Sequence, residues 1–179
     1  QQLLALLNAD GEEARVAGGA VRNALLGQPV KDVDIATTAL PAEVIRRCSD
    51  AGLRTVPTGI DHGTVTVIIE GEPFEVTTLR ADSEHDGRRA QVSFGRDWKV
   101  DAERRDFTIN GLYAAADGTV IDLVGGLDDI ATKTVRFIGD ANKRIAEDKL
   151  RVYRFFRFTA SHGHEQFDED GLVAVHKAA

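Results

Sequence analysis

Two aspartates, Asp32 and Asp34, stand two residues apart in the segment KDVDIAT. The apolar run after them predicts a strand, in which residues two apart project from the same face. Two carboxylates so placed repel each other unless a cation lies between them, and burying an unpaired charge is costly. Because magnesium prefers carboxylates together with substrate phosphates, the pair predicts a Mg²⁺ site for phosphate chemistry. Two solvated loop aspartates are the alternative.

A third carboxylate, Glu75, lies in a predicted strand at 73–80, on the face opposite Phe74 and Val76 if side chains alternate. That face would carry the metal site, although an outward-facing glutamate at a sheet edge is the simpler alternative. Three acids suit two-metal transfer, in which one ion lowers the pKa of an attacking 3′ hydroxyl and the other holds a triphosphate. Asp32, Asp34 and Glu75 are therefore the predicted catalytic metal ligands.

The segment VAGGAVRNALLG, residues 16–27, has the pattern of a strand, a glycine pair and a helix. Gly18 and Gly19 would let backbone N–H groups approach a phosphate at the start of that helix. Arg22, one turn further, could clamp the same phosphate. A tight strand-to-helix turn without a ligand is the alternative, and the nearby aspartates favour the phosphate site.

In the segment RRDFTINGLY, polar residues alternate with a core-facing pattern. Arg105 could bind a triphosphate, while Asp106 and Asn110 could hold a sugar or the loop. Capping of the following helix is the alternative role for Asp106. These three residues are predicted to join the nucleotide site.

The segment EDKLRVYRFFRF places Asp148, Arg151 and Arg154 at steps of three, along one side of a predicted helix. An acceptor beside donors matches the base edges of cytosine and adenine, which both present an exocyclic amine and a ring nitrogen acceptor. Uracil and guanine would leave a charge unpaired, which discriminates against them. A salt-bridged helix face is the alternative.

The elements that must position these residues alternate between β and α patterns. Two β-branched runs joined across Glu70, Gly71 and Glu72 predict a hairpin, and proline at the start of 41–51 predicts a helix. Residues 81–97 predict a mobile loop, and a long helix is expected from Ala141 onward. The predicted strands are at 14–17, 33–36, 53–57, 64–70, 73–80, 120–123 and 134–138.

The chain has 179 residues and a net charge of −7, which allows one domain and the start of another and argues against a broad nucleic-acid-binding face. We expect no membrane span or signal peptide. The single cysteine, Cys48, cannot form an internal disulfide and suits a reducing cytoplasm. The five histidines show no metal-ligand spacing and are expected to be structural or surface residues.

The motifs GGAVRNALLG, KDVDIAT, EVTTLR, RRDFTIN and EDKLRVYRFFRF resemble those of class II tRNA nucleotidyltransferases and bacterial poly(A) polymerases, in order and spacing. The resemblance covers about residues 16–158. It implies an α+β polymerase-β-like head over 1–139, with a mixed, largely antiparallel sheet flanked by helices. The start of an all-helical neck would follow over 140–179, truncated before the body and tail domains.

The resemblance also implies roles for individual residues. Asp32 and Asp34 would hold the metal, with Glu75 as the third acid. The triphosphate would be bound by Gly19, Arg22 and Arg105. The incoming CTP or ATP would be bound by Asp148, Arg151, Arg154 and Arg157. Two positions depart from the family pattern, namely Asn23, where aspartate is usual, and Leu123, where proline is usual.

The predicted function is template-independent addition of CTP and ATP to the 3′ end of tRNA, because TGIDHGTVT at 58–66 resembles the CCA-adding members. Poly(A) polymerase and A-only or CC-only addition are alternatives within the family. A non-catalytic RNA- or nucleotide-binding module is the alternative from another class, against which the three acids argue. The expected cofactor is Mg²⁺, and the expected partners are an RNA 3′ end, CTP and ATP.

Overall fold

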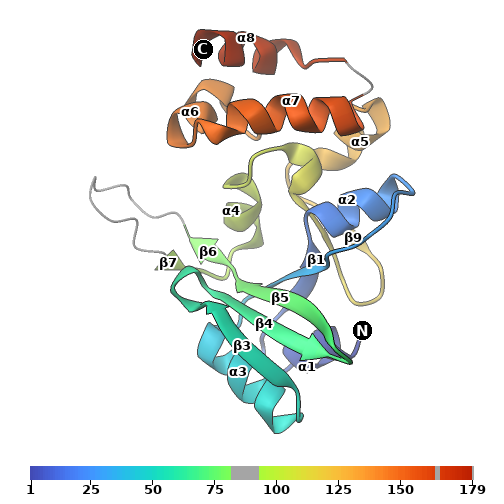
Figure 1. Cartoon of the computed structure of the whole chain (residues 1–179), viewed down its shortest axis with the longest axis vertical. Coiled ribbons are helices and arrows are strands. Elements are labelled where there is room, and N and C mark those ends of the chain that lie inside the picture. Colours follow the sequence, from blue (N-terminus) through green and yellow to red (C-terminus); the bar gives the residue numbers. More distant parts are fainter. Residues whose placement is uncertain (82–92, 164–165, 179) are drawn as a thin grey trace.

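The computed structural model describes residues 1–81, 93–163 and 166–178. Figure 1 shows a β-sheet in the lower part of the molecule with helices α5 to α8 stacked above it. The helices are α1 (Gln2–Leu7), α2 (Gly19–Leu25), α3 (Pro41–Asp50), α4 (Trp98–Glu103), α5 (Gly126–Thr132), α6 (Ala141–Glu147), α7 (Leu150–His162) and α8 (Glu169–Ala178), with 3₁₀ turns η1 (Ile60–His62) and η2 (Thr108–Asn110). The strands are β1 (Ala14–Ala17), β2 (Asp34–Thr37), β3 (Arg54–Gly59), β4 (Thr64–Ile69), β5 (Glu72–Thr78), β6 (Arg80–Ala81), β7 (Ser93–Phe94), β8 (Leu112–Ala114) and β9 (Val120–Asp122).

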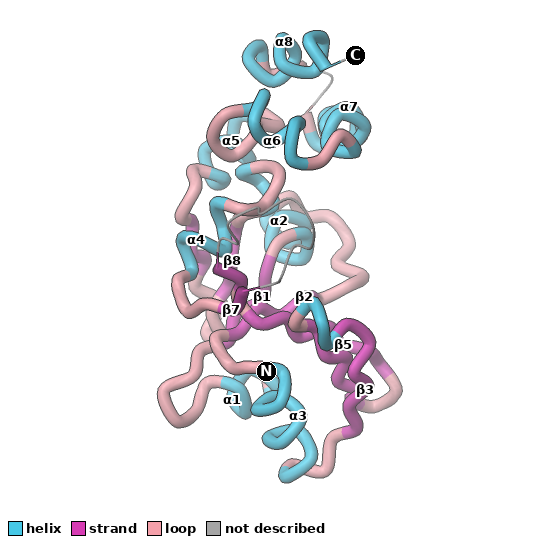
Figure 2. Tube along the Cα trace, turned by 90° about the vertical axis from the view of Figure 1, so that its left-hand side faces the viewer, coloured by secondary structure: helices cyan, strands magenta, loops and turns pink. Residues whose placement is uncertain are grey.

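The main sheet has seven strands in the order β3-β4-β5-β2-β1-β8-β9. Its neighbouring strands run antiparallel except β2 and β5, whose parallel register places Asp34 directly beside Glu75. Helices α1 and α3 lie together on one side of the sheet (Figure 2), around a core that includes Leu7, Val44 and Val65. The predicted α+β class, with a mixed, largely antiparallel sheet flanked by helices, is confirmed.

The predicted hairpin is formed by β4 and β5. Ile69 pairs with Glu72, which leaves Glu70 and Gly71 as a two-residue loop. Both loop residues have positive φ, 52° and 87°. This is the backbone of a type I′ turn, whose twist matches that of the flanking strands. The predicted helix beginning at Pro41 is also confirmed, as α3.

The predicted strand at 134–138 is wrong. In the described residues it contributes only an isolated bridge between Phe107 and Phe137. The apolar residues Val135 and Phe137 are instead buried by packing against helices. The main sheet gains β8, which was not predicted because three residues after a 3₁₀ turn are too short to show an alternating pattern.

The predicted single long helix from Ala141 is also wrong, because the chain forms three helices there. Asp148 has φ −151° and ψ 107°, an extended conformation that ends α6, and its side chain accepts a hydrogen bond from the Leu150 N–H of α7 (2.9 Å). Leu150 and Phe156 of α7 are 65% and 40% exposed.

A cluster of aromatic rings joins these helices to the preceding part of the chain. The Phe137 ring lies 4.9 Å from that of Phe107 and 5.3 Å from that of Phe155 in α7. Ile145 of α6 and Ala174 of α8 complete the same buried cluster. Residues on both sides of the predicted 139–140 domain boundary therefore share one core.

The mobile loop predicted at 81–97 lies mostly outside the described residues, as do His85 and His164. On either side of that gap β6 pairs antiparallel with β7. No helix in the ranges that the structure covers is long and apolar enough to cross a membrane.

Candidate active site

An open pocket of about 1080 Å³ is lined by α2, the segment before β2, residues 104–110 and α7. Every residue predicted to form the site lines it, except Glu75. The lining residues that were predicted are Gly18, Gly19, Arg22, Asp32, Asp34, Arg105, Asp106, Asn110, Asp148, Arg151, Arg154 and Arg157. Residues distant in the sequence thus converge on one cavity.

The predicted metal ligands lie at the start of β2 and beside it. Asp34 is the first residue of β2, and Asp32 precedes it by two residues at the pocket wall. Desolvation raises the pKa of the Asp34 carboxyl, Arg105 partly offsets that rise, and the charge of Asp32 adds to it. Two neighbouring carboxylates that offer only oxygen donors, with the pKa of Asp34 raised, fit a hard divalent cation such as Mg²⁺.

Glu75 is the cross-strand neighbour of Asp34, but its exposed side chain does not line the pocket. Within the described ranges, no three side chains of His, Cys, Asp or Glu approach closely enough to form a ready metal cluster. The role of Glu75 as third ligand therefore stays a prediction, supported by its register.

The glycine pair leads directly into α2. Gly18 has φ 66°, and a Cβ atom there would lie 3.1 Å from Arg105 Nη1. Glycine therefore permits both the turn and the close approach of the arginine. Arg22, only 8% exposed, donates from Nη1 to Asn110 Oδ1 and from Nη2 to Asn23 Oδ1 (2.9 Å).

The pocket concentrates positive charge. Burial lowers the pKa of the Arg22 guanidinium, Asp106 opposes that change, and the nearby charges of Arg154 and Arg157 lower it further. Cations that repel one another in a partly desolvated cavity are stabilised by an anion bound between them. The electrostatics of this wall therefore suit a polyphosphate.

Arg105 is held by a buried partner. Its Nη2 donates to Asp101 Oδ2 at 3.2 Å, and its guanidinium lies 5.2 Å from the centre of the Tyr113 ring. Its Nε is buried without a hydrogen-bond partner in the part of the chain that the structure describes. A partly buried, incompletely satisfied cation at the pocket wall is typical of a group that completes its bonding with a ligand.

Asp106 and Asn110 connect the two sides of the pocket. Asp106 Oδ2 accepts from Arg154 Nε at 2.7 Å, and its Oδ1 accepts from Asn110 Nδ2 at 3.0 Å. Asn110 Oδ1 in turn accepts from Arg22. The following 3₁₀ turn has no side-chain cap, so the alternative of Asp106 as a cap for that turn is wrong.

The predicted base-reading residues reach the pocket, but not as one helix face. Asp148 lies between α6 and α7 rather than on a helix. Arg151 Nη1 donates to Glu147 Oε2 (2.6 Å) and to the Arg144 carbonyl (2.7 Å). Arg154 is bound to Asp106 across the cavity. The carboxylate therefore comes from the break between the helices and the arginines from α7.

Comparison with known proteins assigns the family. Residues 14–136 match the Poly A polymerase head domain. The chain belongs to this family. The matched residues contain the two aspartates, the glycine turn and Arg105, whereas Asp148 and the arginines of α7 lie beyond the matched range.

Curated relatives of this head-domain chain share nearly half of its residues. It is 46% identical to CCA tRNA nucleotidyltransferase 1, mitochondrial, from Danio rerio, over 93% of the chain and 39% of that protein. It is 45% identical to the CCA-adding enzyme of Enterococcus faecalis, over 94% of the chain and 41% of that protein. The chain thus spans about two fifths of the length of these relatives.

A solved structure agrees with the fold. The Bacillus stearothermophilus CCA-adding enzyme, in a crystal structure with CTP, matches 97% of this chain and 41% of its own with a TM-score of 0.85 and 38% identity. The head-domain fold and its first helices are therefore arranged as in that protein.

The two departures from the family pattern have different surroundings. Asn23 keeps hydrogen bonds to Arg22 but supplies no negative charge, so the local ion pair is absent. Leu123 belongs to a turn held by Asp122, whose Oδ1 accepts from the N–H groups of Val124, Gly125 and Gly126. That turn is thus fixed by the aspartate.

Sequence reasoning missed several residues of the site. Asp101 supports Arg105 and Arg104 from beneath the pocket, and its spacing of three and four residues before them was the available signal. Glu147 was not singled out, although it pairs with Arg151. The loop residues Gln28 to Lys31 also line the pocket and carry no pattern that could have revealed it.

Proposed function

We propose that this chain is the catalytic head and the first neck helices of an RNA nucleotidyltransferase that adds CTP and ATP to the 3′ end of tRNA. The observation that carries the proposal is the convergence of acids, phosphate-binding candidates and base-reading candidates on one pocket. The names of the relatives as CCA-adding enzymes favour this activity. We place the protein in the cytoplasm, because its single cysteine, Cys48, is buried and free.

The reaction is an exchange of one phosphate bond for another. The RNA 3′ oxygen attacks the α-phosphorus of the nucleotide, a phosphodiester forms, and pyrophosphate leaves as the hydroxyl proton is lost. Mg²⁺ held by Asp32 and Asp34, with Glu75 as the further candidate ligand, would lower the pKa of that hydroxyl and neutralise the triphosphate. Arg22 and Arg105 would hold the triphosphate through charge-assisted hydrogen bonds.

Base selection falls to the other side of the pocket. Asp148 accepts a hydrogen bond from the exocyclic amine of cytosine or adenine, and Arg151 or Arg154 donates one to the ring nitrogen. Ion pairs with Glu147 and Asp106 hold the guanidinium groups of Arg151 and Arg154 in defined positions before a nucleotide binds. Uracil and guanine would place acceptor against acceptor at Asp148 and be rejected.

The test is incorporation of labelled nucleotides into a tRNA that lacks its last three residues, with Mg²⁺ present. Two additions of C followed by one of A are expected. Continued addition of A would instead identify a poly(A) polymerase, the alternative that the family description itself favours. Unchanged incorporation by a protein carrying both Asp32→Ala and Asp34→Ala would contradict the metal assignment. If the full-length protein binds CTP but incorporates no nucleotide, a binding module would be favoured.

A further inference from the structure

The exposed side of α7 carries a mixed basic and aromatic surface, which we call the α7 patch. Tyr153 is at its centre and is 75% exposed. Residues three and four apart are neighbours on a helix surface, so the patch is completed by the residues one turn to either side. The α7 patch consists of Lys149, Leu150, Tyr153, Phe156 and Arg157.

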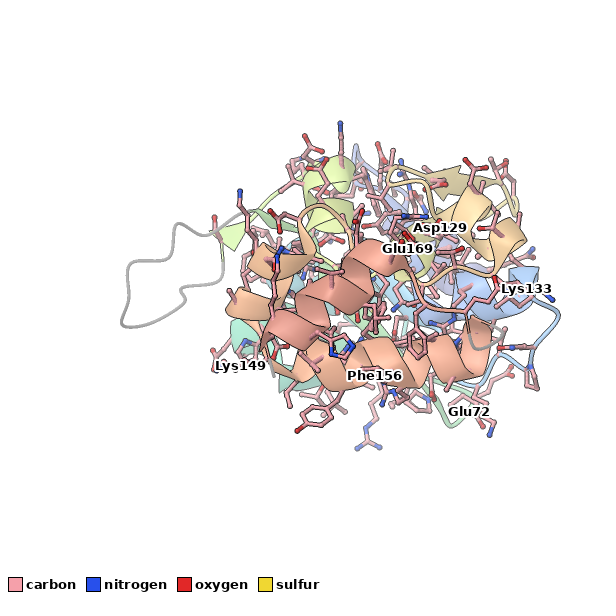
Figure 3. All side chains as sticks on the ribbon, turned by 90° about the horizontal axis from the view of Figure 1, so that it is seen from above. Glu72, Asp129, Lys133, Lys149, Phe156 and Glu169 are labelled. Atoms are coloured by element: carbon pink, nitrogen blue, oxygen red, sulfur yellow. The ribbon has the colours of Figure 1, made fainter. Side chains whose placement is uncertain are left out.

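The α7 patch continues the wall of the active-site pocket. Leu150 and Arg157 belong to both, whereas Tyr153 lies between them on the helix and does not line the pocket. A chain leaving the pocket over α7 would therefore meet the Tyr153 ring next. Figure 3 labels two members of the patch, Lys149 and Phe156.

The α7 patch is positively charged in an acidic protein. Its five residues include two cations, Lys149 and Arg157, and no acid, although the net charge of the chain is −7. In the described part of the chain, no ion pair engages Lys149 or Arg157, and the Arg157 guanidinium contacts only the Phe158 ring (5.1 Å). Their charges remain available to an anionic partner.

Tyr153 also differs from the other exposed ring of α7. The Phe156 ring lies 5.6 Å from that of Phe167, in the contact between α7 and the segment before α8. Tyr153 has no ring or hydrogen-bond partner within the described ranges. An unpartnered aromatic face between two cations, at the mouth of a nucleotide pocket, is the arrangement of a single-stranded nucleic-acid site.

We propose that the α7 patch binds the single-stranded 3′ end of the RNA acceptor, with one base stacked on Tyr153 and backbone phosphates beside Lys149 and Arg157. Stacking tolerates any base because every base has a π-face, so this contact would hold the RNA end as its last residues change. The inference rests on the proposed function, because that reaction requires an RNA end beside the pocket.

The test is fluorescence anisotropy of a labelled single-stranded RNA ending in cytidine, titrated with the full chain. Tyr153→Ala is expected to weaken binding about tenfold, within the range for one lost stacking contact, whereas Tyr153→Phe keeps the ring and the affinity. Val173→Ala, at an exposed apolar position of α8, is the matched control and should bind as the parent does. Lys149→Gln should reduce the dependence of log affinity on log salt by about 0.7.

Titration with CTP separates this inference from the proposed function. Tyr153→Ala should leave CTP binding unchanged, because the side chain does not line the pocket. Tyr153-dependent RNA binding without any nucleotide incorporation would sink the proposed function and leave the α7 patch intact. The proposed RNA site would be overturned if the parent protein bound no RNA, if Tyr153→Ala bound RNA as tightly as the parent, or if Val173→Ala lost as much affinity as Tyr153→Ala. It would also be overturned if Tyr153→Ala changed only the oligomeric state.

Discussion

Asp101 lies beneath the pocket, 1% exposed, and both of its carboxylate oxygens are engaged. Oδ1 accepts from Arg104 Nη2 at 2.6 Å, and Oδ2 accepts from the Tyr113 hydroxyl at 2.7 Å and from Arg105. This acid therefore sets where Arg105 points. It acts on the pocket through Arg105, since it does not line the cavity itself.

Replacing Asp101 by Asn should lower the free energy of unfolding by about 1.5–3 kcal/mol, because the partly exposed Arg104 and Arg105 lose charge-assisted hydrogen bonds to their buried partner. It should also weaken CTP binding, since Arg105 is released. Urea unfolding and CTP titration measure the two effects. Glu103→Gln is the control on the same helix, where an exposed pair with Lys99 (3.8 Å) should contribute less than about 1 kcal/mol.

Asp101 also predicts how stability depends on pH. Burial alone would raise its pKa, but the charges of Arg105 and Arg104 and the Tyr113 hydroxyl outweigh it and hold the pKa below the ordinary 3.8. A pKa lower in the folded state gives stability that is present above about pH 4 and lost as pH falls toward the folded value. Between pH 5 and 2, the parent should lose more stability than Asp101→Asn. Parallel curves would contradict the assignment.

Among the elements, the turn that leads into α2 needs glycine at residue 18 for two reasons, a positive φ and the closeness of Arg105. Gly18 has φ 66° and its missing side chain leaves room for Arg105, whereas Gly27, after the same helix, has φ 65° and nothing within 4 Å of a Cβ. Substitutions at Gly18 and Gly27 can therefore be compared to separate the effect of backbone strain from that of the contact with Arg105.

Gly18→Ala and Gly27→Ala should each lower stability by at least about 1 kcal/mol, the cost of placing a Cβ at positive φ. Gly18→Ala should in addition weaken triphosphate binding, because the new methyl group displaces Arg105. Thermal unfolding and CTP titration of both variants test this. Equal CTP affinities in the two would show that the contact with Arg105 does not position it for a ligand.

Sequence patterns succeeded where an element follows from local chemistry. The β4–β5 turn was predictable because Gly71 tolerates positive φ, and the start of α3 because Pro41 suits a first turn. The break at Asp148 was not predictable, because helical spacing in the apolar residues continues across it. The sequence also could not predict which arginine pairs with Glu147 and which with Asp106, because those contacts depend on how α7 packs on the head.

In the whole molecule, the phenylalanine cluster packs α7 against Phe107 and Phe137 of the preceding part of the chain. Phe155 of α7 is fully buried between Phe137 and the α8 segment. The opposite core, beneath the sheet, includes the equally buried Leu7 and has no residue of α7. The two cores thus stabilise different parts of the pocket.

Phe155→Ala should cost about 3–5 kcal/mol and Leu7→Ala about 2–5 kcal/mol. Only Phe155→Ala should loosen α7, so amide exchange in α6 to α8 should rise and CTP binding weaken in the folded fraction. Hydrogen exchange followed by mass spectrometry measures the exchange of α6 to α8 in the two variants, and CTP titration at low temperature measures their nucleotide binding. Equal exchange of α7 in both variants would mean that the phenylalanine cluster does not hold the helix by itself.

The parallel pairing of β2 with β5 has a consequence for the order of folding. Asp34 and Glu75 become neighbours only when the chain has crossed through α3, β3 and β4 and returned. Contacts between segments so distant in the sequence carry a large loop-closure cost and form slowly, whereas the β4–β5 hairpin is local. During refolding, secondary structure should therefore recover before nucleotide binding. The pairing of Asp34 with Glu75 would report on a non-local part of the fold, because it forms only when β2 and β5 have come together.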